Sequence, residues 1–127
     1  KDGLDEISLA TSTTVAELKD GEISVYDMMP EDAGIESQTL IGLDVDSPAQ
    51  SLELIRAALS GADTHDRAVL KARDMIALNA GAAIYTAGLA SNYPNGVSRA
   101  QKIIQNGDAL LKLESLANYT QQLVAQG

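Results

Sequence analysis

The sequence predicts an α/β protein that reads as one β-hairpin followed by a short helical turn and three helices. An Asp-Gly turn separates two β-rich segments near the start, and two helix-start signals and a long apolar stripe follow. A chain of 127 residues fits one domain or a piece of a larger one. Its 45% hydrophobic content includes no Phe and no Trp, which favours helices packed closely through small residues.

The predicted hairpin lies near the beginning of the chain. Residues 1–12 read as irregular, with a short extended piece possible at 7–10. Residues 13–18 and 23–27 are the two strands, because they carry β-branched residues and an alternating apolar pattern. Between them, Asp20 and Gly21 suit the positive φ angles of a tight primed turn.

Two short elements follow the hairpin. Residues 28–34 predict one helical turn, with Pro30 at its first position and Gly34 at its end. Residues 35–46 read as a loop. The first full helix begins with Ser47 as the cap and Pro48 at the first position, and it ends at residue 61.

The second and third helices carry most of the apolar surface. Asp66 caps a helix over about residues 67–89, and we expect its charge-free second half, residues 75–90, to be buried on all sides. Residues 92–96 read as a loop before a last helix over roughly 97–124. We interpret Gly107, near the apolar stripe of that helix, as a close-packing point, with a bend as the alternative.

Two strands cannot cover three helices, one of which has a charge-free segment. Much of this apolar surface must therefore meet something outside the chain. The sequence also begins without Met and with a motif that looks functional. We expect the chain to be the C-terminal part of a larger α/β protein.

Composition excludes several classes of function. A net charge of −9 and a pI of about 4.3 argue against binding to nucleic acid. The absence of Cys excludes disulfides, a thiolate nucleophile and a cysteine zinc site. No apolar run reaches the length of a membrane span and no signal peptide is visible, so we expect a soluble protein with no membrane partner, compatible with the cytoplasm.

The most informative motif is the cluster of carboxylates Asp2, Asp5 and Glu6 at the start of the chain. Mg²⁺ prefers oxygen ligands and is usually held by one or two carboxylates together with substrate phosphates. Adjacent carboxylates in an irregular turn can present such a pair. The alternative is that these acidic residues are simply solvated.

The other candidates favour ordinary structural roles. His65 is the only histidine and reads as a surface residue before a helix, and the acidic residues at 31, 32, 44 and 46 read as solvated. Asn79 could contact a ligand, but a buried amide satisfied by neighbouring backbone is favoured. Tyr85 reads as a core residue whose hydroxyl reaches an edge. No glycine-rich phosphate loop is present, so any phosphate cradle is expected upstream.

Several segments form a recognisable series: DGLDEIS from Asp2, TTVAEL from Thr13, DGEI from Asp20, PEDAG from Pro30, LNAGAAIY from Leu78 and LLKLE from Leu110. Together they resemble the C-terminal part of anthranilate phosphoribosyltransferases. The resemblance spans nearly the whole chain, and its most specific parts are the DGLDE and TxVxEL stretches.

The resemblance implies a mixed β-sheet domain wrapped by helices, of which residues 1–127 are the C-terminal portion, preceded by a small helical domain through which the enzyme forms a homodimer. It implies transfer of the phosphoribosyl group of phosphoribosyl pyrophosphate to the amine of anthranilate, in tryptophan biosynthesis. The family's Asp-Glu pair holds Mg²⁺ and maps onto Asp5 and Glu6. Its pyrophosphate motif and anthranilate-contacting residues have no match here, so the upstream part of the same enzyme is the expected partner, and this chain is expected to be inactive without it.

Two other functions stay open. A pyrimidine nucleoside phosphorylase resembles this family in fold, but the Asp-Glu motif and the TxVxEL stretch count against it. A non-catalytic helical interaction module, in which the apolar central helix docks a partner, is the alternative from a different class.

Overall fold

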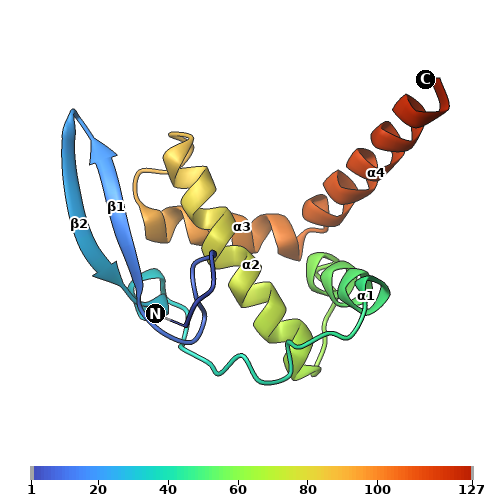
Figure 1. Ribbon diagram of the computed structural model, residues 1–127, viewed down its shortest axis with the longest axis horizontal. Coiled ribbons are helices and arrows are strands. Elements are labelled where there is room, and N and C mark those ends of the chain that lie inside the picture. Colours follow the sequence, from blue (N-terminus) through green and yellow to red (C-terminus); the bar gives the residue numbers. More distant parts are fainter. Residues whose placement is uncertain (1, 127) are drawn as a thin grey trace.

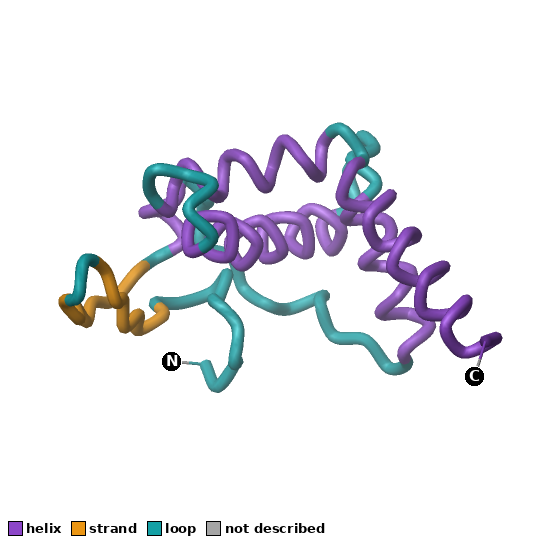
Figure 2. Tube along the Cα trace, turned by 90° about the horizontal axis from the view of Figure 1, so that it is seen from above, coloured by secondary structure: helices purple, strands orange, loops and turns teal. Residues whose placement is uncertain are grey.

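The computed structural model describes residues 2–126. Its elements, in chain order, are β1 (Thr13–Lys19), β2 (Glu22–Met28), the 3₁₀ helix η1 (Pro30–Ala33), α1 (Pro48–Leu59), α2 (Arg67–Thr86), α3 (Tyr93–Gln105) and α4 (Asp108–Gln126). Helix α2 runs through the middle of the molecule and α4 projects away from it (Figure 1). The hairpin and the end of α4 lie at opposite ends in both views (Figure 1 and Figure 2). The predicted hairpin and short helical turn are confirmed.

The hairpin has the predicted turn, but its more apolar face is exposed. The antiparallel register runs from Thr13 opposite Met28 to Lys19 opposite Glu22, and Asp20 and Gly21 have φ angles of 52° and 84°. Positive φ at both central residues is the primed turn that matches strand twist. The apolar side chains Leu18, Ile23 and Val25 are 72%, 74% and 68% exposed. The more apolar face of the hairpin is therefore left uncovered by this chain.

The predicted helix starts are confirmed by their caps. The Ser47 hydroxyl accepts a hydrogen bond from the Gln50 amide at 3.2 Å, and the Asp66 carboxylate accepts one from the Ala68 amide at 2.8 Å. Helix α2 ends at Thr86, three residues before the predicted end. It ends there because the amides that follow turn back and donate to carbonyls of its last turn, as the Leu89 amide does to the Ile84 carbonyl at 3.0 Å.

The prediction of one last helix over 97–124 is wrong, because two helices occupy this region. Helix α3 begins at Tyr93, inside the predicted loop, where the Asn92 side chain accepts a hydrogen bond from the Asn95 amide at 2.9 Å. Gly107 has a φ of +82°, which an L side chain rarely adopts, and it lies between α3 and α4, which run in different directions (Figure 1). Gly107 is thus a full break, so that residues 2–126 hold four α-helices after the hairpin where the sequence predicted three.

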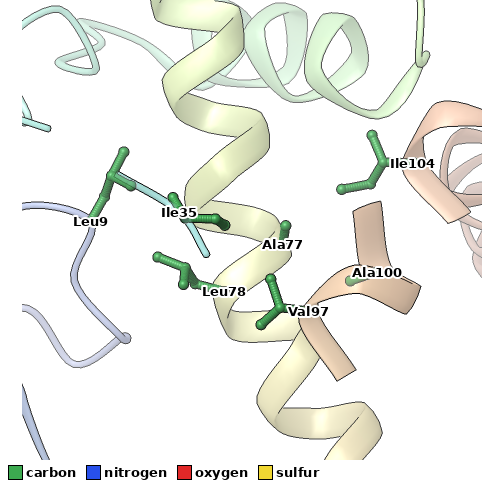
Figure 3. Close-up of a cluster of buried hydrophobic side chains, with 7 residues drawn as sticks. All are labelled: Leu9, Ile35, Ala77, Leu78, Val97, Ala100 and Ile104. Carbon is green, nitrogen blue, oxygen red and sulfur yellow. The ribbon is translucent and has the colours of Figure 1, made fainter. Parts of the chain in front are cut away.

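The core joins α2 and α3 to the segments that flank the hairpin. Figure 3 shows seven buried side chains from these elements: Leu9, Ile35, Ala77, Leu78, Val97, Ala100 and Ile104. Close packing through small residues is confirmed where the two helices meet at Gly81 and Gly96, because a Cβ atom on Gly81 would lie 2.6 Å from both Cα and N of Val97.

The charge-free half of α2 is not buried on all sides within this chain. Its face toward α3 is buried, but Ala83 is exposed, and so is Leu89, which follows the end of the helix. Helix α4 likewise exposes large apolar residues: Leu111, Leu116, Tyr119, Leu123 and Val124. These uncovered surfaces agree with the expectation that other protein covers part of the chain. Over residues 2–126, none of the helices combines the length and the apolar character needed to cross a bilayer.

Candidate functional site

The candidate site is the N-terminal loop, whose two ends are tied together. The Ser8 hydroxyl donates to the Asp2 carboxylate at 2.5 Å and accepts from the Ala10 amide at 3.0 Å. The Ser8 amide in turn donates to the Thr13 hydroxyl at 3.1 Å. The bond from Ser8 lowers the pKa of Asp2, since it stabilises the charged carboxylate. Asp2 is thus part of the loop's own framework.

Asp5 and Glu6 lie between these tied ends, and both side chains are exposed. Their oxygens are the donor type that Mg²⁺ prefers. Over the described residues there is no group of three or more His, Asp or Glu side chains that could hold a metal ion. A Mg²⁺ ion held by this pair would take its other ligands from water or a substrate phosphate, as is usual for Mg²⁺.

Asn79 of α2 holds the loop immediately after Glu6. Its Oδ1 accepts a hydrogen bond from the Ile7 amide at 2.9 Å, and its Nδ2 donates to the Ile7 carbonyl at 3.0 Å. Nδ2 also donates to the Met75 carbonyl at 3.0 Å, one turn earlier in α2. The prediction that this amide is satisfied by neighbouring backbone is confirmed, and the partner is the loop with the carboxylate pair.

A cleft of about 580 Å³ lies beside this loop, between the hairpin and the C-terminal half of α2. Ile7 lines it on the loop side, and apolar residues together with a polar cluster from the hairpin and α2 line the rest. Tyr85 donates to Glu17 at 2.6 Å, and Tyr26 donates to the other carboxylate oxygen at 3.0 Å. Lys19 donates to the Tyr85 hydroxyl at 3.2 Å. Tyr85 is half-buried at the cleft and is not part of the buried core, so the prediction of a core residue is wrong, whereas its hydroxyl does reach an edge.

Hydrogen bonding lowers the pKa of one carboxylate in this cleft, and hydrogen bonding and burial raise the pKa values of three other groups. The bonds from Tyr85 and then Tyr26 lower the pKa of Glu17. The Tyr85 hydroxyl raises the pKa of Lys19, whereas burial, followed by the bond to Glu17, raises that of Tyr26. Burial raises the pKa of Tyr93, which also lines the cleft, to about 12. All four groups keep their ordinary charge states at neutral pH.

Sequence reasoning did not single out Glu17, Lys19, Tyr26 or Tyr93. A signal existed for two of them, because Glu17 and Lys19 share one face of a strand whose register the Asp-Gly turn fixes. Which face meets α2 depends on packing between elements far apart in the sequence. The usual expectation, that the more apolar face of a strand packs against the core, would have placed the opposite face of this hairpin against α2.

The remaining candidates lie outside the cleft and its loop. His65 is exposed in the connection between α1 and α2, as predicted. Asp44 and Asp46 are exposed loop residues. Glu31 and Asp32 are also exposed but have structural partners, since Glu31 accepts from the Ser37 amide at 2.7 Å and Asp32 from the Met29 amide at 2.8 Å.

The hairpin, the tied acidic loop and the close-packed helices together correspond to a known class of α/β domain. The sequence matches the family described as "Glycosyl transferase family, a/b domain" over residues 1–110, and the chain belongs to this family. Among curated relatives, the anthranilate phosphoribosyltransferase of Psychrobacter sp. (strain PRwf-1) is 71% identical over 126 residues, which is 95% of this chain and 34% of the relative. That of Marinobacter nauticus is 59% identical over 121 residues, covering 95% of this chain and 35% of the relative.

Solved structures of similarly named proteins have the same arrangement of elements. Anthranilate phosphoribosyltransferase from Thermus thermophilus superposes with a TM-score of 0.76 at 30% identity, over 91% of this chain and 32% of its own. The enzyme from Saccharomyces cerevisiae, solved in complex with 4-fluoroanthranilate, gives 0.73 at 25% identity, over 88% and 31%. The resemblance noted in the sequence and the α/β fold class are thereby confirmed. The chain spans about a third of the length of the relatives that it matches.

Proposed function

We propose that this chain forms part of an anthranilate phosphoribosyltransferase, which moves the phosphoribosyl group of phosphoribosyl pyrophosphate onto the amine of anthranilate in tryptophan biosynthesis. The observation that carries the proposal is the 71% identity, over nearly the whole chain, to a relative of that name. Membership of the glycosyl transferase family supports the class of reaction, since the family match extends over residues 1–110.

Within this reaction, Asp5 and Glu6 would hold Mg²⁺. Both side chains are exposed and adjacent, and the loop that carries them is tied at its ends by Asp2 and Ser8. The ion, when bound, would neutralise charge on the departing pyrophosphate. The contribution of this chain is to keep two carboxylates together on one short turn beside an open cleft, so that little ordering is needed when the ion binds.

The remaining substrate contacts are proposed to come from protein outside these 127 residues. The exposed apolar faces of the hairpin and of α4 support this, because large uncovered apolar patches mark contacts with other protein. The family resemblance extends the proposal to a cytoplasmic homodimer whose subunit has this chain as the C-terminal portion of its large domain. Native mass spectrometry of the intact protein would test the dimer.

The metal role can be tested in a chimera in which these 127 residues replace the matching segment of the Psychrobacter relative, which is 71% identical. Changing Asp5→Asn together with Glu6→Gln should reduce turnover by orders of magnitude, because the ion loses both protein ligands. The melting temperature should stay unchanged, since both side chains are exposed. Asp44→Asn, at another exposed loop carboxylate, is the matched control.

Near-normal turnover of the double variant at limiting Mg²⁺ would refute the metal role of the pair. A chimera that melts normally but transfers no phosphoribosyl group to anthranilate at any Mg²⁺ concentration would refute the proposed reaction. The nucleoside phosphorylase alternative would then be tested with phosphate and a pyrimidine nucleoside.

A further inference from the structure

We propose that Asn79 is the positioning residue of the metal loop: by binding both backbone groups of Ile7 it holds Asp5 and Glu6 in the arrangement that receives the ion. The inference rests on the proposed function of the pair and assigns a role to a residue of a different element. Asn79 and Ile7 are 72 residues apart along the chain.

The Asn79 side chain forms a clamp on Ile7, by which we mean two hydrogen bonds to the backbone of that one residue. The side-chain amide accepts from the Ile7 amide at 2.9 Å and donates to the Ile7 carbonyl at 3.0 Å. Two antiparallel bonds to one residue fix the orientation of its peptide planes as well as its position. Because Glu6 immediately precedes Ile7, the peptide group that carries the Ile7 amide also carries the carbonyl of Glu6. The clamp therefore sets the direction in which the chain leaves the carboxylate pair.

Helix α2 makes this clamp rigid. Asn79 is half-buried and its Nδ2 is also bonded to the Met75 carbonyl of the same helix at 3.0 Å, which restricts its rotamer. Its neighbour Leu78 is completely buried in the core between α2 and α3. Asn79 thus ties the loop to the core, in which Leu9, two residues after Ile7, is also buried.

The carboxylates themselves provide no comparable restraint. Asp5 and Glu6 are exposed, so their placement depends on the backbone that carries them. That backbone is held at one end by the Asp2–Ser8 bond and at the other by Asn79. Groups that orient metal ligands from behind typically change metal affinity by about ten- to a hundredfold when they are removed.

The test measures metal binding directly in the chimera defined above, with Mn²⁺ as a paramagnetic substitute for Mg²⁺ and electron paramagnetic resonance as the readout. Asn79→Ala should weaken Mn²⁺ binding by about tenfold, since the loop loses its anchor. Asn79→Gln keeps the polar groups but is one methylene longer, so it should fold readily and still weaken binding by displacing the loop. Asn118→Ala, at an exposed asparagine of α4, is the matched control and should bind Mn²⁺ normally.

A second measurement uses the unmodified chimera and needs no variant to fold. If the clamp supports metal binding, the metal must by linkage stabilise the clamp to the same extent. Mg²⁺ should therefore slow hydrogen exchange of the peptide that contains the Ile7 amide. Exchange of the Leu89 amide, which is bonded to the Ile84 carbonyl at the far end of α2, should not change.

The outcomes separate this inference from the proposed function. Loss of Mn²⁺ binding in the Asp5→Asn, Glu6→Gln variant, with affinity within twofold of normal in folded Asn79 variants, would overturn the positioning role alone. Unchanged protection of the Ile7 peptide on addition of Mg²⁺, while Mg²⁺ binds, would do the same. Normal Mn²⁺ binding by the double carboxylate variant would overturn the metal site itself.

Discussion

The contact between α2 and α3 at Gly81 makes a prediction whose size follows from the structure. The perturbation is Gly81→Ala in the chimera. In an open helix this change would stabilise by about 1 kcal/mol, because alanine has the higher helix propensity. Here we expect the opposite sign, because the new Cβ atom would meet Val97.

The magnitude comes from the distances at this contact. The Cβ atom would lie 2.6 Å from the Cα and N atoms of Val97, whereas carbon atoms pack best at about 3.5 Å or more. The two helices would have to separate by about 0.9 Å, the difference between these distances. Overpacking of this kind costs typically about 1–3 kcal/mol, and the backbone of Val97 cannot rotate away as a side chain can. We therefore place the cost at the upper end of this range; after subtraction of the gain in propensity, the expected net loss is about 2 kcal/mol in the free energy of unfolding.

The assay is urea unfolding followed by circular dichroism. Ala83→Gly at an exposed position of the same helix calibrates the propensity effect and should cost about 1 kcal/mol. Adding Val97→Ala to Gly81→Ala should not restore stability, because the close backbone atoms of residue 97 remain. Equal or greater stability of the single variant, or full rescue by Val97→Ala, would refute the argument from backbone contact.

Two further predictions concern polar side chains of α2. Burial raises the pKa of Asp74, so the folded state binds this proton more tightly than the unfolded state; stability is greatest below the ordinary pKa and falls as the pH rises through the raised value. The Gln38 side-chain amide donates to the Asp74 carboxylate at 2.9 Å, and Asp74→Asn keeps an acceptor for this bond. The variant should therefore have a higher melting temperature at pH 7 and lose this advantage near pH 4. A lower melting temperature at pH 7 would contradict the prediction. Arg73 donates to the Ala58 carbonyl at 3.1 Å and the Ala62 carbonyl at 2.9 Å, so Arg73→Met should cost about 1–2 kcal/mol in urea unfolding, and an unchanged midpoint would show that these bonds contribute nothing net.

Local rules predicted the elements that have local causes. The Asp20-Gly21 turn, the Ser47 and Asp66 caps and the 3₁₀ turn at Pro30 all follow from preferences of residues within a few positions of each other. Gly107 could be either a packing point or a break, since glycine serves both purposes and the flanking residues are helical in either case. The apolar pattern ran through it because α3 and α4 both need an apolar face.

In the candidate site, too, the features with local causes could be predicted and those that depend on distant residues could not. The pairing of Asp5 with Glu6 is visible because the residues are adjacent, and their metal role stays a prediction. That Asn79 would be satisfied by backbone was predicted, but the identity of that backbone was not, because 72 residues separate the partners. The cluster around Glu17 depends on which face of the hairpin meets α2. The alternation of residues suggests that the more apolar face meets the helix. This is incorrect here, because the chain covers only the other face of its strands.

The uncovered hairpin has a consequence for how these residues behave when they are separated from other protein. Within residues 2–126 the sheet has only two strands, so each keeps an outer edge of backbone donors and acceptors, and Leu18, Ile23 and Val25 lie beside those edges. Such an edge is a template for strand addition by another copy, which leads to aggregation. The chain on its own would carry this hazard in every molecule, whereas a partner that adds a strand and covers the apolar face would pair one edge and bury the exposed side chains in one step.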